Sequence, residues 1–139
     1  MRLKLVKLAL MFSMFFSSWV YAGVAIIVHP SNNASLDEET IAKIFLGKYK
    51  KYPDGGQAIP VDLTQGASAR TSFVDTVLKK SDSQMKAYWS KLLFTGKGVP
   101  PKEVDTDAEV IDLVANNPSI IGYIDSSAVN DSVKVVYQF

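Results

Sequence analysis

The residues best suited to chemistry lie in one turn that follows a short apolar run. The turn reads Thr64-Gln65-Gly66-Ala67-Ser68-Ala69-Arg70-Thr71. It comes between a strand expected over residues 59–63 and a helix expected to begin near Ser68, so the first amides of that helix would lack acceptors. Such amides and the helix dipole attract anions, and Arg70 could add a charged fork. The pattern predicts a site for a phosphate-like oxyanion; the alternative is that Ser68 only caps the helix and Arg70 is solvated.

Other kinds of chemistry lack the residues they need. The single histidine, His29, precedes a proline after an apolar run, and no G-x-S-x-G motif is present for a hydrolase triad. No set of Cys, His and carboxylate residues has the spacing of a zinc site. The acids Asp105, Asp107, Glu109 and Asp112 lack the glycine and glutamate of a calcium loop and suit the start of a helix. We therefore expect no enzyme, no metal and no cofactor.

The first 22 residues have the three parts of a secretory signal peptide. The basic residues Arg2, Lys4 and Lys7 precede an apolar segment over residues 8–16, and Val20-Tyr21-Ala22 supplies a cleavage site. Serines interrupt the apolar segment, which is shorter than the roughly 20 residues of a membrane span. Cleavage is therefore favoured over a retained anchor. We expect a periplasmic protein of residues 23–139, one domain with no stable membrane insertion.

Charge and cysteine content narrow the function classes further. Three of the 15 Lys and Arg residues lie in residues 1–22, which leaves 12 against 14 acidic residues and a formal charge near −2. A nucleic-acid binder would show a basic face instead. Lys43, Lys48, Lys50 and Lys51 form a cluster that we interpret as a solvated helix end. The absence of cysteine excludes disulfides and thiol chemistry.

Short apolar runs alternate with helical patterns along the rest of the chain. Strands are expected over residues 24–28, 59–63, 120–124 and 133–137. Three helices are expected to start at capping pairs, namely Ser35 with Glu38, Ser81 with Gln84, and Thr106 with Glu109. Residues 97–103, which include two adjacent prolines, are expected to be a connector. This order predicts an α/β sandwich with a mostly parallel sheet.

Three motifs carry a family resemblance. They are Ile44-Phe45-Leu46-Gly47-Lys48, the turn from Gln65 to Phe73, and Asn117-Pro118-Ser119-Ile120-Ile121-Gly122-Tyr123. In order and spacing they resemble segments of the periplasmic phosphate-binding proteins of ABC importers, the PstS-like type 2 periplasmic binding proteins. The resemblance implies one three-layer α/β/α lobe of such a receptor. It implies phosphate or a related oxyanion as ligand at residues 64–71, with Ser31, Asn32 and Tyr123 as candidates for a second wall.

The turn departs from the family pattern at three expected ligand positions. Where the resemblance implies an arginine, a serine and a threonine, this sequence has Leu63, Ala67 and Ala69. Each hydrogen bond to a charged group contributes about 1.5–3 kcal/mol. If additive, three losses would weaken binding by roughly three to six orders of magnitude. Two hypotheses follow. The first is an oxyanion-binding module of ABC-type uptake, whose second wall comes from a homodimer or a partner protein. The second is a periplasmic adaptor that kept the binding-protein fold but lost high-affinity anion binding.

The signal peptide generates the first testable prediction. We expect the exported protein to begin at Gly23, because signal peptidase would cut after the small residue Ala22. Amino-terminal sequencing and intact mass measurement of protein from the periplasmic fraction check this. Recovery of the uncut chain in the membrane fraction would show a retained anchor instead.

Overall fold

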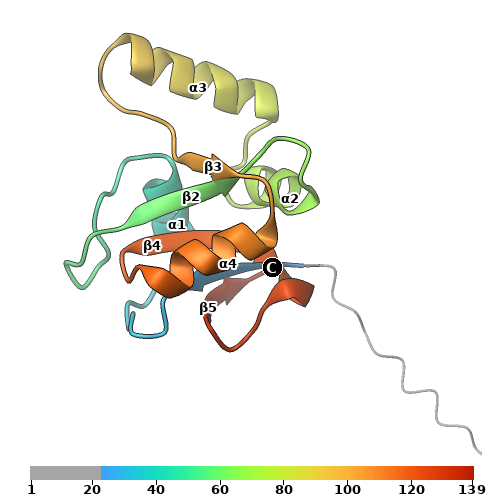
Figure 1. Ribbon diagram of the computed structural model, residues 1–139. Helices are drawn as coiled ribbons and strands as arrows, with labels where there is room; N and C mark the ends of the chain where they lie inside the picture. Colours follow the sequence, from blue (N-terminus) through green and yellow to red (C-terminus); the bar gives the residue numbers. More distant parts are fainter. Residues whose placement is uncertain (1–22) are drawn as a thin grey trace, which may run out of the picture.

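The computed structural model describes residues 23–139, which form a five-stranded sheet with helices on both faces (Figure 1). The strands are β1 (Val24–Val28), β2 (Ile59–Leu63), β3 (Lys102–Val104), β4 (Ile120–Asp125) and β5 (Lys134–Gln138). The helices are α1 (Glu38–Phe45), α2 (Ser68–Thr76), α3 (Asp82–Phe94) and α4 (Asp107–Asn116), with a 3₁₀ turn at Ser126–Ala128. The expected signal peptide lies outside the described residues.

The direction of the strands decides which loops can meet. The sheet order is β3-β2-β4-β1-β5; β2 is parallel to both β3 and β4, whereas β1 is antiparallel to both β4 and β5. Four strands therefore run in one direction and β1 runs against them. The prediction of a mostly parallel sheet is confirmed, with β1 as the opposed strand. As a result, the last residues of β1 lie beside the first residues of β4, at the end of the sheet where β2 also begins.

Neighbouring residues of β4 show the three layers, because successive side chains of a strand point to opposite faces. On one face, Gly122 lies against α4, where a Cβ atom would stand 2.5 Å from Val110 Cγ1. On the other face, Tyr123 stacks on Phe73 of α2 with ring centroids 4.1 Å apart. Phe45 of α1 completes this cluster, 4.7 Å from Phe73. The predicted α/β/α sandwich is thus confirmed.

Side-chain caps start three of the four helices. Ser81 and Gln84 form the full capping box predicted for α3, and the Thr106 side chain accepts from the Glu109 amide at the start of α4. For α1 the prediction was wrong, because Asp37 rather than Ser35 caps it. Its carboxylate accepts the Thr40 amide at 2.8 Å. The acidic cap also suits the positive end of the helix dipole.

The connector expected over residues 97–103 overlaps the first two residues of strand β3, which the sequence did not predict. β3 has only three residues, Lys-Glu-Val, of which one is buried, so neither an apolar run nor an alternating pattern marks it. It pairs in parallel with β2 at the edge of the sheet. None of the helices in residues 23–139 is long and apolar enough to span a bilayer.

The contact between β4 and α4 gives a prediction about stability. Gly122→Ala would force its new Cβ against Val110, and we expect it to lower the free energy of unfolding by about 1–3 kcal/mol. Urea denaturation measures the change. Adding Val110→Ala makes room, so the double variant should lose less than the sum of the two single losses. Gly56→Ala is the control, since its nearest atom would be 3.4 Å away; equal losses at both glycines would contradict the packing argument.

Candidate functional site

The predicted site lies where β2 ends and α2 begins. Gly66 has φ +99°, a conformation that L side chains rarely adopt, and this lets the chain turn sharply into the helix. The Ala67 amide closes the turn by donating to the Thr64 carbonyl at 3.2 Å. Gln65, Gly66 and Ser68 are exposed. Apart from the two adjoining residues, no atom of residues 23–139 lies within 4 Å of the position that a Cβ on Gly66 would occupy, so this side of the turn is open.

Three backbone amides at the start of α2 have no acceptor within residues 23–139. The first helical bond runs from the Thr71 amide to the Ala67 carbonyl at 3.2 Å, and no side chain caps the helix. The amides of Ser68, Ala69 and Arg70 therefore remain unpaired. Ser68 is the first residue of the helix and Ala67 is its cap, so the expectation that Ser68 caps α2 is wrong. Unpaired amides at the start of a helix can donate hydrogen bonds to an anion.

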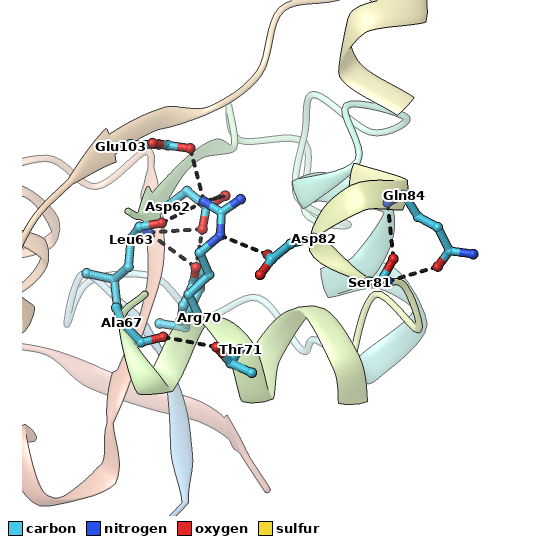
Figure 2. A network of polar contacts seen from close by, with 10 residues as sticks. Asp62, Leu63, Ala67, Arg70, Thr71, Ser81, Asp82, Gln84 and Glu103 are labelled. Carbon is cyan, nitrogen blue, oxygen red and sulfur yellow. Dashed lines mark hydrogen bonds and ion pairs between the residues drawn. The ribbon is translucent and has the colours of Figure 1, made fainter. Parts of the chain in front are cut away.

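Arg70 does not extend toward these amides. Its guanidinium turns back toward β2 and β3, as Figure 2 shows. Nη1 donates to the Leu63 carbonyl at 2.7 Å and to Glu103 Oε1 at 3.0 Å. It also lies 3.4 Å from Asp62 Oδ2, and Nε lies 3.7 Å from Asp82 Oδ1. The side chain is 11% exposed. The expectation of a free guanidinium fork is therefore wrong, because carboxylates of the same chain balance its charge.

Asp62 is the buried acid at the centre of this cluster. Its Oδ1 accepts hydrogen bonds from the Tyr123 hydroxyl and, at 2.9 Å, from the Leu63 amide. Burial raises the pKa of Asp62, while the Tyr123 hydrogen bond and the Arg70 charge act in the opposite direction. Burial, and then the negative Asp62, raise the pKa of Tyr123 above its ordinary value. Tyr123 therefore stays protonated, and its hydroxyl donates a hydrogen bond to Asp62.

The proposed second wall is wrong in all three of its residues. Tyr123 is fully buried, and its hydroxyl is bound to Asp62. Ser31 and Asn32 follow β1, and they lie at the opposite edge of the sheet from Gly66 because β1 runs against β2 and β4. There, Ser31 Oγ pairs with His29 Nδ1 at 2.7 Å and Asn32 Oδ1 accepts the Ala34 amide at 2.9 Å. The antiparallel direction of β1 is the physical reason why Ser31 and Asn32 lie far from the turn.

The positions that depart from the family pattern offer an anion no side-chain donor. Leu63 and Ala69 are buried apolar residues, and Ala67 is half-buried. Thr64 is also half-buried, and the Thr71 hydroxyl donates back to the Ala67 carbonyl at 3.5 Å. The exposed Ser68 hydroxyl adds a side-chain donor at the start of the helix, and the exposed Gln65 amide lies in the turn before it. Within residues 23–139, no three Asp, Glu or His side chains are grouped to hold a metal ion.

Sequence reasoning missed the carboxylates that surround Arg70. Asp62, Asp82 and Glu103 come from three separate elements, so their spacing in the chain carries no motif. One signal was available: Asp62 stands between Val61 and Leu63 in an apolar strand. A charge in a buried strand requires a hydrogen-bonded partner of opposite charge. Arg70, at the start of the following helix, was the nearest cation in the chain.

Comparison with known proteins establishes the family. The model of the PBP superfamily domain matches residues 10–137, nearly the whole chain, and the protein therefore belongs to that superfamily. The expected membership of the periplasmic-binding-protein family is confirmed by this match, and solved structures of phosphate-binding proteins share the fold. These relatives are substrate-binding proteins rather than enzymes.

Several solved structures share the fold, including the following three. One, described as a phosphate ABC transporter substrate-binding protein with bound phosphate from Clostridium perfringens, is 24% identical with a TM-score of 0.65, covering 82% of this chain and 44% of its own. An ABC-type phosphate transport receptor from Vibrio cholerae is 20% identical with a TM-score of 0.64, covering 82% and 45%. PstS from Borrelia burgdorferi is 17% identical with a TM-score of 0.60, covering 83% and 47%. The chain thus spans less than half the length of these proteins.

The Arg70 cluster gives a prediction about stability and pH. Arg70→Met would leave Asp62 buried without a cation, and we expect it to lower the free energy of unfolding by about 3–5 kcal/mol at pH 7. The loss should shrink toward pH 4, since the uncompensated Asp62 then binds a proton and becomes neutral. Urea denaturation at both pH values measures it. Glu103→Gln is the control, because Glu103 is 48% exposed and its removal should cost under about 1 kcal/mol. A loss for Arg70→Met that is small or independent of pH would contradict the argument.

Proposed function

We propose that this chain is a solute-binding module that takes a small oxyanion, with phosphate as the first candidate, and serves ABC-type uptake in the periplasm. The observation that carries the proposal is the set of unpaired amides of Ser68, Ala69 and Arg70, beside the open face of Gly66. Membership of the PBP superfamily supports a solute-binding role. The relative from Clostridium perfringens was solved with phosphate bound.

Binding in this site depends on the backbone. The three amides and the Ser68 hydroxyl would donate to the anion, and the dipole of α2 would favour its charge. Three charge-assisted bonds supply roughly 5–9 kcal/mol, from which association subtracts about 4 kcal/mol or more. The expected affinity is therefore millimolar, unless a second chain or a partner protein supplies another wall. Because Arg70 is balanced by Asp62 and Glu103, it adds little net charge.

An adaptor that kept the fold is the second candidate function. It is favoured by the apolar residues exposed around the end of α3, where Phe94 is 93% and Val99 is 74% exposed. Solute binding does not account for these side chains. An adaptor needs a stoichiometric protein partner and no anion, so the two functions predict opposite outcomes in a calorimeter with oxyanions.

Titration calorimetry with phosphate, sulfate and molybdate tests the proposed function. We expect heat from at least one oxyanion, with a Kd near the millimolar range. Ser68→Asp places a negative charge beside the amides and should weaken binding at least tenfold, while the same charge does not disturb a helix start. Ser72→Asp is the matched control, since Ser72 is an exposed serine one turn further along α2 and should bind almost as the unaltered protein.

Two results would contradict the proposal. One is the absence of heat from all three oxyanions at 10 mM in protein whose folding is confirmed by circular dichroism. The other is an equal loss of binding in Ser68→Asp and Ser72→Asp, which would place the anion away from the start of α2.

A further inference from the structure

Exposed apolar side chains gather on one part of the surface. Of the large hydrophobic residues in residues 23–139, six are exposed: Tyr49, Ile59, Leu93, Phe94, Val99 and Val135. The first three and Val99 line two adjoining hollows, and Phe94 follows Leu93 directly in the chain. Only Val135, on β5, lies outside this group. Contiguous exposed apolar residues mark interaction surfaces more often than isolated ones do.

The two hollows form one surface, which we call the α3 groove. The larger hollow, of about 570 Å³, lies between α3 and the end of α1 and is lined by Leu46, Trp89 and Leu92, among others. The smaller one, of about 240 Å³, shares Val99 and Trp89 with it and extends toward Ile59. The surface is therefore concave, with apolar side chains at its floor and its rim.

The groove is open because α3 packs on the sandwich at few points. Of its 13 residues only Met85 and Trp89 are buried, and Figure 1 shows the helix standing clear of the sheet. The Tyr88 hydroxyl donates to the Leu46 carbonyl at 2.6 Å. Trp89 lies so close to Gly47 that a Cβ there would be 3.2 Å from the indole. These contacts fix α3 against α1 and leave its carboxyl-terminal end uncovered.

The rim of the groove carries only positive charge. Lys48, Lys50 and Lys97 line the larger hollow, and Lys102 lines the smaller one. All four are exposed, and no Asp or Glu lines either hollow. None of the ion pairs in residues 23–139 uses these lysines. The sequence-based interpretation of a solvated helix end explained part of this cluster, but not the apolar side chains beside it.

We propose that the α3 groove docks an acidic amphipathic segment of a partner protein. Apolar side chains of that segment enter the two hollows and contact Trp89, Val99 and Phe94, while its carboxylates pair with the rim lysines. A two-fold dimer through this face would bring two lysine rims together, which disfavours a second copy. A flat membrane surface would leave the concave hollows unfilled, which disfavours a lipid partner.

Fluorescence anisotropy with defined peptides tests the proposal on protein produced from the full chain. The probe is a labelled 18-residue helical peptide with Leu on one face and Glu on the other; its comparison has Lys in place of every Glu. We expect the acidic peptide to bind at least tenfold more tightly. Val99→Ser and Lys97→Glu should each weaken binding at least fivefold. Their matched controls, Val135→Ser and Lys79→Glu, alter exposed residues outside the groove and should change it less than twofold.

Three results would overturn the proposal. The first is equal binding of the acidic and basic peptides, or no binding of either at 1 mM. The second is binding of phosphatidylglycerol vesicles that depends on Phe94 while the acidic peptide fails to bind, which would make the groove a membrane-contacting surface. The third is a dimer in analytical ultracentrifugation that Val99→Ser dissociates, which would make it an interface between copies. The oxyanion titration is independent, because Gly66 and Ser68 line neither hollow.

Discussion

The buried pairing of Arg70 with Asp62 is the interaction on which the arrangement of the site depends. Arg70 comes from α2, Asp62 from β2 and Glu103 from β3, while Tyr123 of β4 holds the other oxygen of Asp62. A buried charge is tolerated only when its partners are in place. The cluster therefore fixes the start of α2 against the sheet, and with it the direction in which the free amides point. Loss of Arg70 would leave the buried Asp62 without a compensating cation.

The same pairing separates this protein from a receptor that holds its ligand with charged side chains. The nearest guanidinium is already neutralised, and alanine or leucine stands at the three positions where the family resemblance implies side-chain ligands. What remains for an anion is the polypeptide backbone, the Ser68 hydroxyl and the dipole of α2. Such a site distinguishes charge and size better than chemical identity, since amides donate to any oxyanion. The oxyanion site that we propose is therefore weak and broadly selective.

Much of the fold could be predicted from the sequence, because it depends on local patterns. Apolar runs marked four strands, and Ser81 with Gln84 marked a helix start to the residue. β3 escaped because three residues form no pattern and its pairing with β2 depends on the rest of the sheet. For the candidate site, the turn at Gly66 and the unpaired amides after it could be predicted from the sequence. The direction of Arg70 and the distance of Ser31 from the turn could not, since both depend on strand order and direction, which no single segment encodes.

The position of β1 has a consequence for how the protein folds. Residues 24–28 pair on one side with residues 121–125 and on the other with residues 134–138, so β1, from the start of the described segment, lies between two strands from its end. Contacts between residues so far apart in sequence slow folding, because a long loop must close before they form. A chain emerging from the ribosome could not complete this sheet until its last strand was made. Such a delay would suit the export across a membrane that we propose for this protein.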